Sequence, residues 1–266
     1  MNKKNIKTIG LPKGEVEVYW IGDAKLHAYK TNDPMTDEVF ILEKYGHALI
    51  IEAPCFKDNI KELSDYICNL SVRVEAMFLS YHMAGGTFFP SVPVYATKNA
   101  DVFGHSGKGK EMVDEFTGAF GKAFDSSIHK VKTVIDAGSI KSAGFTMVIV
   151  PTKDAFDIEI PEIGAVYIHS MGHDVHSIVP STGEADCQIA QLRSIIVRRI
   201  DMILTSHHTP ENSENARTKV EYLETLKKVA GTSKDAAAFK RTMKLKYPGY
   251  SGENYLDMTA GMLFPK

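Results

Sequence analysis

The chain has 266 residues, a length that suits one large domain or two small ones with a sizeable buried core. Hydrophobic residues make up 44% of it and charged residues 24%, which is the composition of a folded protein and excludes a disordered one. The 31 basic and 33 acidic residues nearly cancel, so no overall charge attracts nucleic acid or an anionic membrane. No apolar run approaches the roughly 20 residues of a membrane span. No apolar segment follows the basic first residues either, so we expect a cytoplasmic protein without a secretory signal.

The first half of the chain reads mainly as strands with one clear helix. Alternating or continuous apolar residues predict strands at 15–20, 25–30, 39–42, 48–52, 76–79 and 92–96. Between them, Ile60, Leu63, Ile67 and Leu70 recur at helical spacing, which predicts a helix over 58–70. The glycines and lysines of 104–110 predict a mobile basic loop, with helical character following up to residue 122.

The second half alternates strands and helices. Strands are expected at 144–151, 163–168 and 202–204, with a turn and a short strand within 151–162; helices are expected at 185–199, 211–229 and 234–245. The remaining tail, 247–266, reads as irregular and aromatic. This alternation predicts a layered architecture of helices and sheets.

Histidines follow three of the predicted strands directly. His82 ends the segment Ser80-Tyr81-His82, His169 follows Tyr167-Ile168, and the pair His207-His208 follows Ser206. Metal hydrolases commonly carry their ligands at strand ends, on loops that a rigid sheet holds in place. We therefore expect the three segments to converge at one edge of a sheet. Of the other histidines, those at 27, 47, 105 and 129 have no partner pattern and read as structural or surface residues.

The order of these segments resembles the metallo-β-lactamase-fold superfamily. The strand ending in LIIEAP is followed by a helix, by LSYHMAGG and VPVYAT, and later by TKDAFDIEIP and GAVYIHS. The resemblance extends over nearly the whole chain and implies a single α+β domain over 1–266. Its expected fold is a four-layer αββα sandwich, with 234–266 as a C-terminal helix and aromatic extension. Members typically bind two zinc ions, or iron or manganese, and hydrolyse a lactam, lactone, thioester or phosphoester by a metal-held hydroxide.

The family's first metal-binding motif, His-x-His-x-Asp-His before a Gly-Gly pair, is shortened here to the segment 80–86. A count without gaps back from the glycines places His82 at the family's aspartate and Met83 at the adjacent histidine. A three-residue deletion instead aligns Tyr81 with the first histidine. Both alignments leave at most one imidazole where the family has several.

The later ligand positions have also changed. The family's next histidine falls at or near Asp154, and its last histidine falls at His207 or His208. Its bridging aspartate falls at Ser170, with His169 in place of the preceding glycine. Two divalent cations about 3.5–4 Å apart need anionic bridges to offset their repulsion, and a serine hydroxyl does not supply that charge. The resemblance therefore implies one zinc (or iron or manganese) at most, or no metal, and makes a two-metal site improbable. We therefore expect the metal ligands to be His82, Asp154, His169 and His207.

A small-molecule substrate is expected at the same edge of the sheet. Its candidate contacts are Tyr81, Ser170, His173, His176 and His208. Three functions remain open at this point. The first is a hydrolase with a mononuclear site that acts on an ester, lactone or phosphoester. The second is a non-catalytic relative that binds a small molecule and has lost metal and activity. The third is a homo-oligomeric scaffold whose aromatic tail packs on another subunit or over the pocket. None of the three involves nucleic acid or a membrane.

Overall fold

A computed structural model describes residues 6–265 as two compact units. The first unit comprises the chain up to His169 together with the short segment Ser206–Thr209. The second comprises Ser170–Thr205 and the chain from Pro210 onward. That the whole chain forms one domain with an extension at 234–266 stays a prediction.

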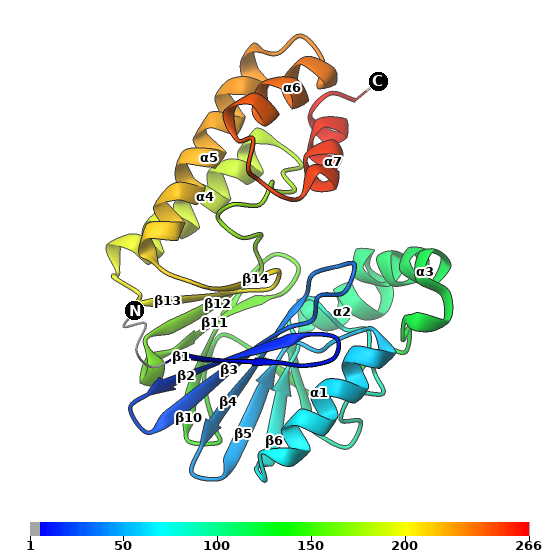
Figure 1. The fold of residues 1–266 in the computed structure, drawn as a ribbon, viewed down its shortest axis with the longest axis vertical. Helices are drawn as coiled ribbons and strands as arrows, with labels where there is room; N and C mark the ends of the chain where they lie inside the picture. Colours follow the sequence, from blue (N-terminus) through cyan, green and yellow to red (C-terminus); the bar gives the residue numbers. More distant parts are fainter. Residues whose placement is uncertain (1–5, 266) are drawn as a thin grey trace. The chain divides into compact units, whose positions relative to one another are not determined.

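One large sheet dominates the first unit (Figure 1). Its strands, in spatial as well as chain order, are β1 (Ile6–Gly10), β2 (Glu15–Ile21), β3 (Ala24–Lys30), β4 (Glu38–Lys44), β5 (His47–Ile51), β6 (Arg73–Phe78), β7 (Val94–Thr97) and β8 (Val131–Ile135). Strands β1 to β5 pair antiparallel, and β5 to β8 pair parallel. The unbroken apolar run of β5 is buried over Ala48–Ile51, as expected for a strand covered on both faces.

The first unit also holds four antiparallel strands of a second sheet. They are β9 (Gly138–Ser142), β10 (Phe145–Pro151), β11 (Phe156–Ile160) and β12 (Ala165–Ile168), each paired with the next. The two sheets face each other: the ring of Phe40 on β4 meets that of Tyr167 on β12 at 6.3 Å, edge to face. Ser80 Oγ, just past β6, donates a hydrogen bond of 2.6 Å to the carbonyl of Phe156 on β11. The predicted α+β sandwich is confirmed.

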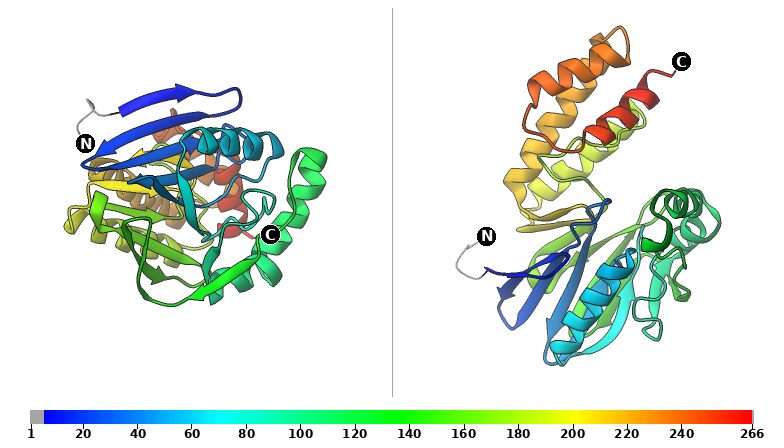
Figure 2. Two further views of the ribbon diagram at one scale, coloured as in Figure 1. Left: turned by 90° about the horizontal axis from the view of Figure 1, so that it is seen from below. Right: turned by 45° about the vertical axis from the view of Figure 1, so that its right-hand side comes forward.

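Helix α1 (Lys57–Asn69) covers the outer face of the large sheet (Figures 1 and 2). Two of its side chains contact β3. The buried Asn59 donates its amide to Tyr29 Oη at 2.8 Å, and Tyr66 Oη lies 2.7 Å from His27 Nδ1. His27 is therefore a structural residue, as the sequence indicated. Helices α2 (Lys98–Ser106) and α3 (Lys108–Phe120) follow β7. The prediction of a mobile loop at 104–110 is wrong, because only Gly107 separates these two helices. Gly104 and Gly109 are buried at their contacts with Met83 and Phe103, where a larger residue would clash.

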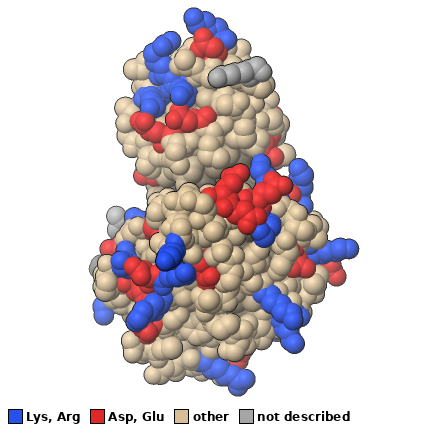
Figure 3. All heavy atoms as spheres, turned by 90° about the vertical axis from the view of Figure 1, so that its right-hand side faces the viewer, with Lys and Arg blue, Asp and Glu red and all other residues tan. Residues whose placement is uncertain are grey.

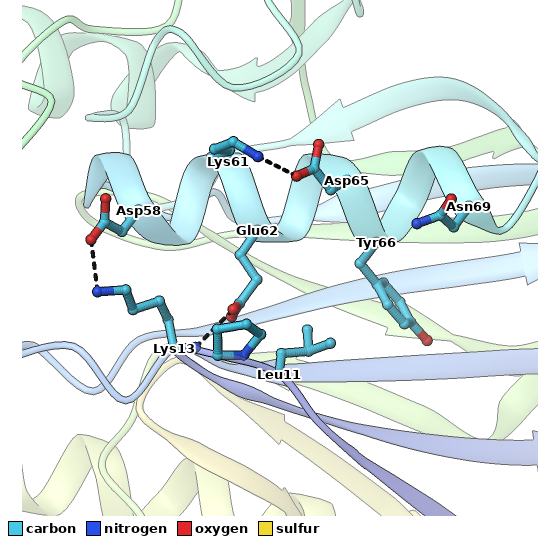
Figure 4. A pocket seen from close by; sticks show the side chains of 9 residues that line it. Leu11, Lys13, Asp58, Lys61, Glu62, Asp65, Tyr66 and Asn69 are labelled. Carbon is cyan, nitrogen blue, oxygen red and sulfur yellow. Dashed lines mark hydrogen bonds and ion pairs between the residues drawn. The ribbon is translucent and has the colours of Figure 1, made fainter.

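A groove of about 390 Å³ lies between the Leu11–Lys13 turn and α1 (Figure 4). Its charged side chains pair with one another: Lys13 with Asp58 at 2.8 Å, and Lys61 with Asp65 at 2.6 Å. Glu62 points from α1 toward the turn and accepts the backbone N–H of Lys13 at 2.7 Å. These contacts attach the turn to the helix. None of the residues that line the groove is among the site residues expected from the sequence.

The second unit is mainly helical. It contains β13 (Met202–Thr205), α4 (Thr182–Val197), α5 (Ser213–Thr232), α6 (Ala236–Lys246) and α7 (Glu253–Leu263), and β14 (His208–Glu211) runs into it from the first unit. The prediction of an irregular tail over 247–266 is wrong, because α7 occupies 11 of those residues. Within this unit Lys219 on α5 is buried and donates to the carbonyls of Gly172 and Val175 at 2.7 and 2.6 Å, which anchors the loop before α4.

The helices and the surface charge can be examined for signs of a membrane or nucleic-acid partner. Among residues 6–265, no helix is long and apolar enough to cross a membrane. On the face drawn in Figure 3, acidic and basic side chains both occur and much of the surface is uncharged. That face therefore offers no continuous basic surface of the kind that binds a nucleic-acid backbone.

The stability of the first unit should depend on pH through His129. This histidine is buried, and burial lowers its pKa to about 4, against the weaker opposing effect of Asp125. The unfolded chain binds a proton there near pH 6.5 while the folded protein does not, so acidification favours unfolding. The contribution of neutral His129 is complete above pH 6.5 and is lost as the pH falls toward 4, by about 3 kcal/mol in total at 1.36 kcal/mol per pH unit.

Urea unfolding at pH 7 and at pH 4.5, on wild type and on His129→Gln, measures this effect. Other groups titrate in the same range, so the difference between the two proteins isolates His129. We expect the wild type to lose more stability than the variant between the two pH values; equal losses would contradict the prediction.

Candidate metal centre

Three imidazoles converge in the first unit, each from a segment that sequence analysis singled out. His82 follows β6, His169 follows β12, and His207 lies directly before β14. Their ring centroids are 5.4 Å apart for His82 and His169, 5.1 Å for His82 and His207, and 5.2 Å for His169 and His207. One ring nitrogen of each lies within 4.8 Å of those of the other two. The three rings thus surround one point at the edge of the sandwich.

Glu52 holds the loop that carries His82. It follows β5, its side chain is fully buried, and it accepts the backbone N–H groups of Ser80 and Tyr81 at 3.1 Å and that of His82 at 3.0 Å. Tyr167 on β12 donates its hydroxyl to the same carboxylate at 2.5 Å. A carboxylate suits this place because it has several lone pairs and can satisfy all four donors at once. Glu52 therefore links both sheets to the loop of the first candidate ligand.

The Gly85-Gly86 pair lets the loop that carries His82 pack closely against neighbouring backbone. Gly85 has a φ of +84° and donates its N–H to the carbonyl of Asp125 at 3.0 Å. A side chain at this position would meet the carbonyl oxygen of Pro54 at 2.2 Å, so only glycine fits. The glycines therefore serve the packing of the loop that presents His82.

Asp37, which sequence reasoning missed, lies beside two of the three imidazoles. It immediately precedes β4 and is fully buried. Its Oδ1 is 3.3 Å from His207 Nδ1 and 3.9 Å from His82 Nδ1, and its Oδ2 accepts from Cys55 Sγ at 3.5 Å. The sequence signal was faint: an aspartate in a turn-rich segment before an apolar strand, which is usually a turn residue. Pairing β4 with β3 and β5 is what brings this turn to the site.

The site's charges favour metal binding. Burial, reinforced by the nearby His207 and His82, holds the pKa of His169 well below its ordinary value, so this imidazole is neutral at pH 7. Burial opposes ionisation of Asp37, but His82 and His207 outweigh it and hold the pKa of Asp37 below its usual range. A neutral His169 and an anionic Asp37 are in the protonation states that binding of a divalent metal requires.

The residues present fit a zinc-class ion. Three imidazoles with a fourth, open position form a common catalytic zinc set. His82 Nδ1 and Asp37 Oδ1 are both buried without a hydrogen-bond partner, which is rare for polar atoms in folded proteins. A bound cation is one group that would satisfy such atoms.

The fourth ligand implied by the family resemblance is placed elsewhere. Asp154 lies in the turn between β10 and β11 and is not among the residues whose ligand atoms cluster with the three imidazoles in the described part of the chain. Its role as a ligand stays a prediction. Tyr81, in contrast, is at the site: its ring stacks on that of His169 at 4.1 Å and meets Phe103 edge to face at 5.5 Å.

The remaining predicted substrate contacts fall in different parts of the chain. His208 belongs to the first unit, and its Nδ1 lies 3.0 Å from the carbonyl oxygen of Thr209. Ser170, His173 and His176 belong to the second unit. There, His173 Nδ1 lies 2.7 Å from Glu211 Oε1, and buried His176 has its Nδ1 3.0 Å from Tyr222 Oη. Contact of these residues with a substrate stays a prediction.

Comparison with known proteins gives similarity in structure alone. No protein-family model matches the sequence, and no curated protein does. Among solved structures, a metallo-β-lactamase family protein from Thermus thermophilus superposes with a TM-score of 0.61 at 11% identity, covering 91% of each chain. A metallo-β-lactamase from Erythrobacter litoralis, with β-mercaptoethanol in its active site, gives 0.57 at 11% identity, covering 82% of this chain and all of its own. One from Hirschia baltica gives 0.51 at 11% identity, covering 82% of this chain and 97% of its own.

Proposed function

We propose that this chain, which has the metallo-β-lactamase fold, is a metal-dependent hydrolase whose catalytic ion is held by His82, His169 and His207. The observation that carries the proposal is the convergence of three imidazoles from three strand ends on one point. The substrate class that we propose is a small ester, lactone or phosphoester.

The chain's own residues supply the positions that such a reaction needs. A divalent ion bound here would activate water and polarise the carbonyl or phosphoryl oxygen of the substrate. Asp37, 3.3 Å from His207 Nδ1, is placed to orient that ring and raise its basicity, as carboxylates do beside metal-binding histidines. Tyr81 presents its ring beside His169, where an aromatic wall would position an apolar acyl or alkyl group.

Metal analysis tests the proposal directly. Protein purified without chelator should contain at least one equivalent of zinc, iron or manganese, and it should hydrolyse a panel of aryl esters, lactones or phosphodiesters. Prolonged dialysis against a chelator should remove both the metal and the activity, and the metal alone should restore them. Less than a tenth of an equivalent of transition metal, with no stabilisation on adding zinc, would overturn the proposal.

The alternative is a non-catalytic protein that binds a small molecule at the same place. One observation favours it: Tyr81 covers one face of His169 by stacking, which occupies space beside a candidate ligand. A protein of this kind would show a rise in melting temperature with ligand, no turnover and no response to chelator. The metal analysis above separates the two functions.

The structure and the family resemblance point to different acids beside the metal, and paired variants decide between them. Asp37→Asn should weaken zinc affinity by about 10- to 100-fold, the usual effect of losing a carboxylate that orients a metal-binding histidine. Asp154→Asn should leave the affinity within about twofold. Competition with a fluorescent zinc chelator measures both. A larger loss for Asp154→Asn would restore Asp154 as the ligand and remove Asp37 from that role.

A further inference from the structure

A second group of ligand-type residues adjoins the three imidazoles, on the far side of Asp37. Asp33, Asp37 and Cys55 each offer one ligand atom within 4.8 Å of those of the other two. The thiol of Cys55 lies 3.5 Å from Asp37 Oδ2 and 3.8 Å from the thioether sulfur of Met35. Asp33 and Asp37 lie in the segment between β3 and β4, and Cys55 lies between β5 and α1. All of these residues belong to the first unit.

This group is buried, and its polar atoms are incompletely paired. Asp33 is 8% exposed, Cys55 2% and Asp37 not at all. Asp33 Oδ1 accepts the N–H of Met35 at 2.8 Å, but Asp33 Oδ2 is buried without a hydrogen-bond partner, and so is Asp37 Oδ1. Two buried carboxylates repel each other and are costly to leave uncompensated. Among the residues that the structure describes, no lysine or arginine is recorded in an ion pair with either of them.

We propose that Asp33, Asp37 and Cys55 form a second cation site, for a zinc-class divalent ion, which shares Asp37 with the three-imidazole centre. This inference rests on the proposed function only in that the first ion is taken to lie at the three imidazoles. Each oxygen of Asp37 faces one of the two groups: Oδ1 faces the imidazoles of His207 and His82, and Oδ2 faces the thiol of Cys55.

The shared aspartate changes the expectation drawn from Ser170. The loss of the family's bridging acid at Ser170 argues against a two-metal site, because paired cations need anionic groups between them. Asp37 supplies a carboxylate from the other sheet. Burial and the neighbouring Asp37 raise the pKa of Asp33 to about 7 and the pKa of the Cys55 thiol well above its ordinary value, so a bound cation would have to displace their protons to gain two more negative ligands. A donor set of thiolate and carboxylates suits an ion of intermediate softness such as zinc or cobalt, whereas magnesium prefers oxygen ligands alone.

Cobalt substitution tests this site, because a thiolate bound to Co²⁺ absorbs in the near ultraviolet and imidazoles or carboxylates bound to it do not. The chain has three cysteines, and Cys68 and Cys187 are both exposed. The double variant Cys68→Ser/Cys187→Ser therefore leaves Cys55 as the single thiol and serves as the background protein. After removal of metal, it is titrated with Co²⁺, and bound cobalt is counted by mass spectrometry.

We expect two equivalents of bound cobalt in this background and a thiolate absorption band that appears with one of them. Adding Cys55→Ser, or Asp33→Asn, should abolish the band and reduce bound cobalt to one equivalent, while adding His207→Ala should remove the other equivalent. Circular dichroism melting identifies any variant that fails to fold. If a variant does not fold, the thiolate band of the background protein still tests whether Cys55 binds cobalt.

The two proposals fail in different ways. One equivalent without the thiolate band, lost on His207→Ala and kept on Cys55→Ser, overturns the second site and leaves the first intact. A thiolate band with one equivalent that survives His207→Ala overturns the three-imidazole centre as the primary metal site. No bound cobalt at all overturns both.

Discussion

Replacing Glu52 by alanine should lower the free energy of unfolding by about 4 kcal/mol, near the upper end for a single substitution. The variant removes the acceptor of the N–H groups of Ser80, Tyr81 and His82, and it leaves the hydroxyl of Tyr167 with Ser206 Oγ alone as its partner. Hydrogen bonds to a charged group contribute about 1.5–3 kcal/mol each, and partial rearrangement recovers some of that loss. Urea unfolding followed by circular dichroism measures the change.

Two further variants control this experiment. Glu111 is exposed on α3, and Glu111→Ala should change stability by no more than about 0.5 kcal/mol. Glu52→Gln keeps the size of the side chain and one carbonyl acceptor, but its NH₂ group faces other donors. Its loss of unfolding free energy should therefore lie between that of Glu111→Ala and that of Glu52→Ala. A loss below 1 kcal/mol for Glu52→Ala would show that the loop does not depend on this carboxylate.

Replacing His207 by alanine should weaken the affinity for zinc by more than about 100-fold. Residues that only orient a ligand already cost 10- to 100-fold, and His207 is one of three imidazoles that would bind the ion itself. It also leaves Asp37, a buried carboxylate, without the ring 3.3 Å away. Isothermal titration of metal-free protein with zinc measures the affinity, and hydrolysis should fall in parallel.

The matched control is His105→Ala, which removes an exposed imidazole on α2. It should leave zinc affinity and melting temperature unchanged within error. If His207→Ala and His105→Ala bind zinc equally well, the three imidazoles do not form the metal centre.

Much of the fold follows from local patterns along the chain. The apolar run LIIE predicted β5, and the 3.6-residue spacing of Ile60, Leu63 and Ile67 predicted α1, because both elements bury a face that the sequence marks. The errors arise where local signals mislead. The glycines of 104–110 read as a flexible loop, yet they allow close packing against Met83 and Phe103. Short strands such as β9 were missed because most of their residues are polar and exposed.

The sequence by itself determined which three segments carry the imidazoles, since each histidine stands directly after a strand-like apolar run. Only the tertiary structure decided which acid lies beside them. Asp37 and Asp154 are both turn aspartates, and local sequence does not distinguish them; the pairing of β4 between β3 and β5 buries Asp37 within 3.3 Å of His207. The roles of Glu52 and Cys55 likewise depend on contacts between residues 18 to 115 positions apart. Such contacts form when sheets pair and pack, a process that local sequence patterns do not specify.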